Sequence, residues 1–138
     1  VADRDREALD RIGQWLGRNG EAVFGTHPED IYPVPNQGPC YHYGMFTCRK
    51  NVAYLTVFYY PGNDIVISKI GPEILKAELL ATGQALHVEP LSNARWRISG
   101  LPEAPPDDLA PVIKIEFAAP PYQLAFSDAS WLEGTYQP

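Results

Sequence analysis

The sequence has few cysteines and no long apolar run. Cys40 and Cys48 are its only two cysteines, too few for a disulfide framework and, alone, for the four ligands of a structural zinc site. The longest apolar run, Val52–Tyr60, contains a threonine and three tyrosines. It falls far short of the roughly 18 apolar residues that indicate a membrane-spanning helix. The sequence therefore predicts neither a disulfide-stapled scaffold nor a transmembrane helix.

Positive charge is also scarce. The chain has 11 Lys and Arg against 17 Asp and Glu, which gives a net charge of −6 at pH 7. This balance argues against nucleic acid or an anionic membrane as the main partner, because both require a basic surface. The first residues, Asp3 to Glu7, alternate in charge and do not resemble a secretory signal.

The sequence contains many residues that disfavour helices. The 138 residues include 14 prolines and 11 glycines, which helices tolerate poorly, so strands and turns should dominate and an all-α bundle is excluded. In contrast, 45% of the residues are hydrophobic and only 20% are charged. That composition favours one folded domain with a real core over disorder.

The one long helical pattern lies at the start of the chain. Asp3 is the expected N-cap, and Asn19-Gly20 is the expected stop. The apolar residues of this segment fall within an arc of about 120°: Ala8 and the larger Leu9, Ile12, Trp15 and Leu16. We call the four larger residues the helix stripe. We expect Gly13 and Gly17 to let a neighbouring element approach closely, so that the helix is not free-standing.

From Gly25 to Cys48, prolines and glycines interrupt any helical or strand-like pattern of apolar residues. This segment predicts a long ordered connection or irregular edge strands.

After Arg49, apolar residues recur at every second position, as in a β-strand. Val52–Tyr60 and 65–69 flank a Pro-Gly-Asn-Asp turn and predict a β-hairpin with a four-residue loop.

Further short segments of alternating hydrophobicity follow at intervals of about ten residues. They span 75–79, 85–89, 94–98 and 113–117, with a turn at Thr82-Gly83-Gln84. In the first of them, Leu75, Ala77 and Leu79 are expected on the dry face. The predicted fold is mainly β: an antiparallel β-sandwich with one N-terminal amphipathic helix.

Candidates for catalysis are few. The acidic pairs Glu29-Asp30 and Asp107-Asp108 lie in polar loops, where we expect solvated turn residues. A catalytic pair of carboxyl groups needs two different environments that separate the pKa values. The sequence also has no nucleophile elbow and no phosphate-binding glycine loop. We therefore predict no catalytic residue in this chain.

Metal binding would have to use Cys40, His42 and Cys48, with a fourth ligand from His27 or His87. The spacing matches no standard zinc hairpin, so we predict no metal site and no cofactor. A disulfide between the two cysteines is an alternative in an oxidising compartment. Two ordinary buried thiols are the default interpretation.

Aromatic residues are plentiful at 12% of the chain. Tyr54, Phe58 and Tyr60 should share one strand face, and Tyr59 should lie on the other. Flat aromatic side chains on a sandwich can stack on sugar rings, so Tyr59, Trp131 and Tyr136 are candidate carbohydrate-binding residues. The pattern favours the competing interpretation, in which large aromatics mainly supply buried area.

With these elements placed, a family resemblance emerges. Ile12–Thr26 reads IGQWLGRNGEAVFGT and resembles the pattern IGxWLxxNGEAIYGT, which closes the catalytic barrel of family 29 α-L-fucosidases. Phe46–Leu55 and 74–83 resemble strand motifs of the same family. The correspondences run from about Asp3 to Phe117, which is most of the chain.

In that family, an aspartate nucleophile and a carboxylic acid/base perform the retaining chemistry, and the (β/α)₈ barrel carries both. The resemblance implies that this chain starts at the last barrel helix and lacks both residues. It divides the chain into 1–26, resembling the end of the barrel, and 27–138, a β-sandwich with an extra C-terminal tail. His27 stands where the family usually has arginine, and 120–138 have no clear counterpart.

We therefore expect a non-catalytic C-terminal accessory or structural domain of an α-L-fucosidase-like glycoside hydrolase. Its partner would be a catalytic barrel in the same parent chain, which the helix stripe would face. One rival is a free-standing module that binds fucosylated glycans; another is a module that self-associates through the helix stripe. An independent hydrolase is the least supported, because fold resemblance cannot supply missing carboxylates.

Overall fold

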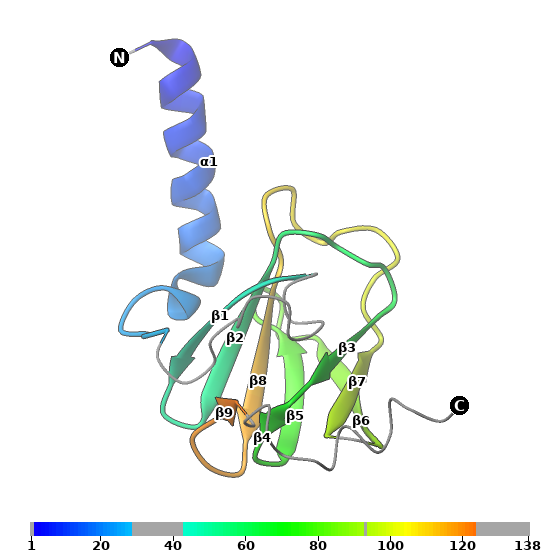
Figure 1. The fold of residues 1–138 in the computed structure, drawn as a ribbon. Coiled ribbons are helices and arrows are strands. Elements are labelled where there is room, and N and C mark those ends of the chain that lie inside the picture. Colours follow the sequence, from blue (N-terminus) through cyan, green and yellow to red (C-terminus); the bar gives the residue numbers. More distant parts are fainter. Residues whose placement is uncertain (1, 29–42, 93, 124–138) are drawn as a thin grey trace, which may run out of the picture.

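The computed structural model describes residues 2–28, 43–92 and 94–123 (Figure 1). Helix α1 (Asp3–Asn19) and the short 3₁₀ helix η1 (Gly20–Ala22) come first. The described strands follow: β1 (Gly44–Arg49), β2 (Val52–Val57), β3 (Asp64–Ser68), β4 (Ile70–Gly71), β5 (Ile74–Leu79), β6 (Ala85–Leu91), β7 (Arg95–Ser99), β8 (Val112–Phe117) and β9 (Tyr122–Gln123).

Seven of these strands form one antiparallel sheet in the order β1-β2-β8-β5-β6-β7-β3, and β4 pairs with β9. The sheet curls so that its two ends face each other across the core (Figure 1). Leu55, Ile67, Ile98 and Ile115 come from four strands, and none is measurably exposed. Burying each such side chain stabilises the fold by about 1.5–3 kcal/mol. The predicted mainly-β, antiparallel fold with an N-terminal helix is confirmed.

The predicted hairpin between Val52–Tyr60 and 65–69 is wrong. β2 pairs with β1 and β8, whereas β3 pairs with β7 at the other end of the sheet. The strand ends early because the N–H groups of Phe58 and Tyr59 both donate to the Tyr43 carbonyl, which turns the chain away. The real hairpin joins β1 to β2 through Lys50, whose φ of 53° suits a tight turn.

β5 departs from strict alternation. The register with β8 shifts between Ile74 and Lys76, and such a bulge places two successive residues on the same face. Leu75, expected on the dry face, is therefore 61% exposed, while Ile74, Ala77 and Leu79 are buried. The turn at 82–84 joins β5 to β6 as predicted.

α1 spans the predicted residues, but its N-cap is Ala2 rather than Asp3, and no side chain caps it. The helix extends away from the sheet and meets it only near its C-terminal end (Figure 1). Apart from the two chain neighbours and the backbone of the helix itself, no described atom lies within 4 Å of where a Cβ would sit on Gly13 or Gly17. The close approach predicted at these glycines is therefore not made within the described residues. As the one described α-helix, α1 does not qualify as a membrane span.

Candidate functional site

The end of α1 and η1 rest on the outer face of the sheet, and this junction is the candidate functional site. Ala22, Tyr54 and Val112 are buried there, and the partly buried Trp15 packs against them. Asn19 is fully buried, and its amide nitrogen donates to the Trp15 carbonyl at 3.3 Å. The NGEA segment (residues 19–22) thus fixes the position at which the helix leaves the sheet.

Glu21 is the centre of a charged cluster at this junction. One of its carboxylate oxygens accepts from Lys114 Nζ at 3.0 Å and from Arg49 Nη2 at 3.3 Å. Arg49 also donates to the Tyr54 hydroxyl at 3.1 Å. Because Arg49 belongs to β1 and Lys114 to β8, one carboxylate links η1 to two strands of the sheet.

The cluster shifts the pKa values of its members in opposite senses. Burial acts to raise the pKa of Glu21, but hydrogen bonds from Lys114 and Tyr54 and the charges of Lys114 and Arg49 outweigh it, so the pKa is lowered. Burial acts to lower the pKa of Lys114, and its bond to Glu21 reverses this and raises it. The pKa of Tyr54 is raised, mainly by burial. Glu21 is therefore held as a carboxylate.

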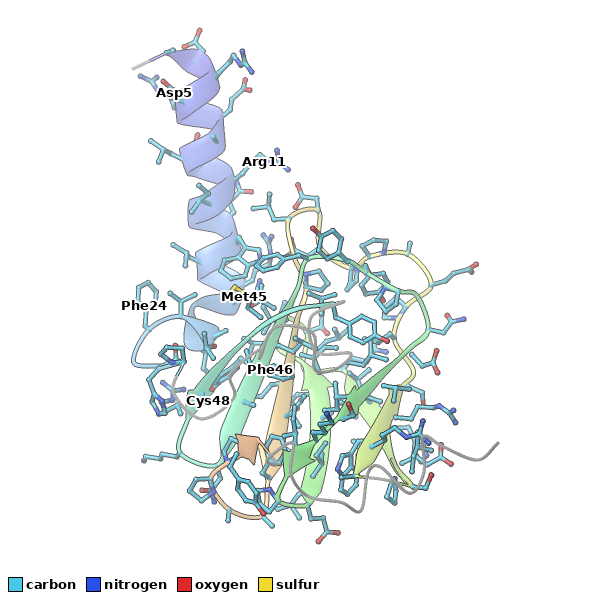
Figure 2. All side chains as sticks on the ribbon, in the orientation of Figure 1. Asp5, Arg11, Phe24, Met45, Phe46 and Cys48 are labelled. Atoms are coloured by element: carbon cyan, nitrogen blue, oxygen red, sulfur yellow. The ribbon has the colours of Figure 1, made fainter. Side chains whose placement is uncertain are left out.

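A second set of contacts attaches α1 to the β7–β8 loop (100–111). Arg18 donates to Asp107 through Nε at 3.3 Å and Nη2 at 2.9 Å, and Trp15 Nε1 donates to the Ala110 carbonyl at 2.6 Å. Nearer the N-terminus, Arg11 donates to Asp108 at 3.0 Å. We call these contacts the α1 clamp. Arg11 reaches from the helix towards this loop in Figure 2.

The clamp corrects one prediction about the acidic pairs. The Asp108 side chain is 69% exposed, as expected of a turn residue, but the Asp107 side chain is only 5% exposed. Burial acts to raise the pKa of Asp107, and bonds from the Leu109 and Ala110 amides and from Arg18 lower it overall. Glu29-Asp30 lie outside the described residues.

An open groove lies between α1, the outer face of β1 and β2, and the β7–β8 loop, with a volume of about 430 Å³. Its lining residues are Trp15, Met45, Thr47, Thr56, Phe58, Leu109 and Ala110. We call it the α1 groove. Figure 2 shows Met45 beside the base of α1, whereas its neighbour Phe46 lies within the sheet. None of the described residues that line the groove is charged, and sequence patterns did not reveal it.

Of the three candidate sugar-stacking residues, only Tyr59 lies within the described residues, so the prediction of a shared stacking surface stays a prediction. Tyr59 is 72% exposed, and Trp131 and Tyr136 lie outside the described residues. The other aromatics of this segment diverge: Tyr54 is buried at the junction, while Phe58 is 54% exposed on the groove. Because the strand ends at Val57, the alternation expected beyond it does not hold.

Of the residues considered for metal binding, His27, Cys48 and His87 lie within the described residues. Cys48 is buried in the main core, 1% exposed, and a backbone bridge pairs it with His27. Cys40 and His42 lie outside the described residues. Over residues 2–28, 43–92 and 94–123, no group of three or more His, Cys, Asp or Glu could hold a metal ion.

No protein-family model and no curated protein matches the sequence, but solved structures do. A bacterial fucosidase with a triazole-bearing pyrrolidine inhibitor is similar to this chain with a TM-score of 0.65 and 21% identity, over 93% of this chain and 26% of that one. α-L-Fucosidase isoenzyme 1 from Paenibacillus thiaminolyticus gives a TM-score of 0.67 and 20% identity, over 84% of this chain and 27% of that one.

A family GH29 α-L-fucosidase from Bacteroides thetaiotaomicron, trapped as a covalent intermediate, gives a TM-score of 0.59 and 25% identity, over 76% of this chain and 23% of that one. This chain therefore spans about a quarter of the length of the enzymes that it resembles. The resemblance to family 29 α-L-fucosidases that the IGQWLGRNGEAVFGT segment indicated is confirmed in the fold, which is that of about one quarter of such an enzyme.

Proposed function

We propose that this chain is the non-catalytic C-terminal accessory domain of an α-L-fucosidase-like glycoside hydrolase. The observation that carries the proposal is the combination of high coverage of this chain with coverage of only 23–27% of the fucosidases. Such a match is expected when one domain of a larger enzyme is compared with the whole. On this proposal 1–26 complete the catalytic barrel and 27–138 form the accessory β domain.

The state of the carboxylates supports the non-catalytic assignment. Retaining glycosidases need two carboxyl groups about 5–5.5 Å apart, one with a raised pKa that serves as the acid. Glu21 and Asp107 are both paired with cations, and both pKa values are lowered, which is the wrong direction for an acid. Asp64 and Glu89 both form ion pairs with Arg97, at 3.4 and 3.2 Å.

The proposed role of the domain is to support the catalytic barrel and shape the approach to its active site. The helix stripe would supply the main apolar contact, since Leu9 is 63% exposed and Ile12 is 49% exposed. Exposed apolar surface of this kind marks interaction sites. Within the described residues, the stripe is covered only at its Trp15 end, where that ring reaches the junction.

The first test is the size of the native polypeptide, measured by immunoblotting source cells with an antibody against this domain. A band heavier by roughly 250 residues, the size of a (β/α)₈ barrel, is expected. A band near 15.4 kDa would contradict the proposal. The purified 138-residue chain should also show no hydrolysis of a chromogenic α-L-fucoside; measurable turnover would contradict the non-catalytic role.

The two rival functions have their own readouts. A glycan-binding module should show quenching of tryptophan fluorescence by fucosylated glycans but not by glucose, and Tyr59→Ala should weaken that response. A self-associating module should sediment as a dimer of the 138-residue chain. The accessory-domain proposal predicts neither result.

A further inference from the structure

Exposed apolar side chains in the described chain gather at one end of the molecule. Large hydrophobics that are at least 41% exposed come from α1, the segment after it, and the surroundings of the α1 groove. These are Leu9, Ile12, Val23, Phe24, Met45, Phe58, Tyr59 and Leu109. Only Leu75 and Tyr122 share this exposure elsewhere in the described residues. An apolar concentration this one-sided is typical of a surface that another protein segment covers.

The α1 groove is the concave part of this surface, and its walls are fixed. Trp15 forms the helix wall, and its bond to the Ala110 carbonyl ties it to the loop wall. Thr47 on β1 donates to the Ala22 carbonyl at 2.6 Å, which ties the sheet wall to η1. The groove is therefore formed before any partner arrives, which lowers the entropic cost of binding.

The chemistry of the groove selects an apolar occupant. Among its described lining residues, only Thr47 and Thr56 have polar hydroxyl side chains, and the Thr47 hydroxyl already donates to the Ala22 carbonyl. A sugar needs several well-placed polar groups to hold its hydroxyls, and this lining does not provide them. Met45 offers a flexible, polarizable surface that adapts to apolar side chains. A volume of about 430 Å³ suits a short apolar peptide segment.

We propose that the α1 groove is the seat for an apolar segment from the catalytic part of the same parent polypeptide. This inference rests on the proposed function and adds to it the surface and the kind of segment that docks there. We assign the segment to the catalytic part because about three quarters of the length of each similar fucosidase has no counterpart in this chain. Trp15 belongs to both the groove and the helix stripe, so one partner can cover both surfaces.

The test uses the full polypeptide that source cells make and places a photoreactive residue in its α1 groove. Phe58 is replaced by p-benzoylphenylalanine, the protein is illuminated, and crosslinked peptides are identified by mass spectrometry. We expect crosslinks to a peptide outside residues 1–138, at least tenfold more abundant than those from the same replacement at Leu75. Leu75 is the matched control, because it is 61% exposed against 54% for Phe58. It follows Ile74, which pairs with Phe117 at the end of β8, whereas Phe58 lies near the start of β8, where Thr56 pairs with Val112.

Each other outcome overturns the proposal in a distinguishable way. Crosslinks to a second copy of residues 1–138 would assign the groove to self-association, and crosslinks to a glycan probe would assign it to sugar binding. A long polypeptide with no crosslink above the Leu75 control would overturn the groove assignment and leave the proposed function standing. A native band near 15.4 kDa would overturn both.

A second variant tests the same proposal in case the replacement of Phe58 disturbs folding. Met45→Glu introduces a charge at a side chain that is 55% exposed, so the isolated 138-residue chain should keep its melting temperature within about 2 °C, as expected for a surface change. In the long polypeptide, the same change should lower the melting temperature by at least 5 °C. Equal effects in the two proteins would overturn the proposal.

Discussion

Arg18 and Asp107 are 89 residues apart in sequence, yet the arginine donates two hydrogen bonds to one carboxylate oxygen of the aspartate. The aspartate side chain is almost fully shielded, whereas the arginine remains 42% exposed. This pair, together with the bond from Trp15 to Ala110, joins the N-terminal helix to a loop near the far end of the chain. The direction in which α1 leaves the sheet is therefore set by the β7–β8 loop as well as by η1.

Replacement of Asp107 should weaken this attachment. Asp107→Asn removes the charge that Arg18 binds, so the free energy of unfolding should fall by about 1–2 kcal/mol. Urea unfolding followed by circular dichroism measures the change. Asp108→Asn is the matched control: that side chain is 69% exposed, and its loss should cost less than about 0.5 kcal/mol. Equal losses for the two variants would contradict the larger contribution of the shielded Arg18–Asp107 pair compared with the exposed Arg11–Asp108 pair.

Trp15→Phe separates packing from hydrogen bonding at the same junction. The phenylalanine keeps most of the apolar contact but cannot donate to the Ala110 carbonyl, so stability should fall by about 1 kcal/mol or more. Hydrogen exchange of the α1 amides should also become faster, because the helix loses one of its anchors. Unchanged exchange in α1 would show that Trp15 does not hold the helix.

A buried and an exposed side chain of the sheet should differ strongly in how much their removal lowers stability. Ile98→Ala removes a fully buried side chain and should cost about 2–5 kcal/mol. Leu75→Ala removes a side chain that is 61% exposed and should change stability by less than about 0.5 kcal/mol. Thermal unfolding of both variants measures the difference. A large loss from Leu75→Ala would place Leu75 in the core and exclude the bulge in β5.

Acid should destabilise the protein through Glu21 and Asp107. Their folded pKa values lie below their unfolded values, so the unfolded chain binds protons first, and stability falls as the pH drops below about 4. Glu21→Gln should reduce this slope in urea titrations between pH 5 and pH 2. At high pH, the raised pKa of Lys114 has the opposite sign: its contribution disappears as the pH rises above about 10.4. An unchanged acid slope in the variant would contradict the Glu21 cluster.

The elements with strong local signals were predictable from sequence. The period and stop signal of α1 located a helix that ends at Asn19, and the alternation at 113–117 located a central strand. Strand pairing was not predictable in the same way. The Pro-Gly-Asn-Asp turn after Tyr60 looks like a hairpin turn, but β2 pairs with β1 and β8, and β3 pairs with β7. Local turn chemistry cannot reveal such distant pairings.

The candidate site was predictable only in part. The NGEA segment was singled out as a motif, but its role in the Glu21 cluster depends on Arg49 and Lys114, which lie far along the chain. Asp107 looked like an ordinary turn residue because its partner Arg18 is equally distant. The α1 groove combines a helix, two strands and a loop, so no single stretch of sequence carries a signal for it.

The position of β8 has a consequence for how the chain becomes folded. β8 is the last but one of the described strands in sequence, yet it lies between β2 and β5. Until Val112–Phe117 has left the ribosome, the other described strands of this sheet form two separate groups, β1 with β2 and β5 with β6, β7 and β3. Such distant contacts slow folding and leave strand edges exposed meanwhile. A nascent chain that stops before Val112 therefore carries two unjoined half-sheets with unpaired edges, a ready substrate for chaperones and proteases.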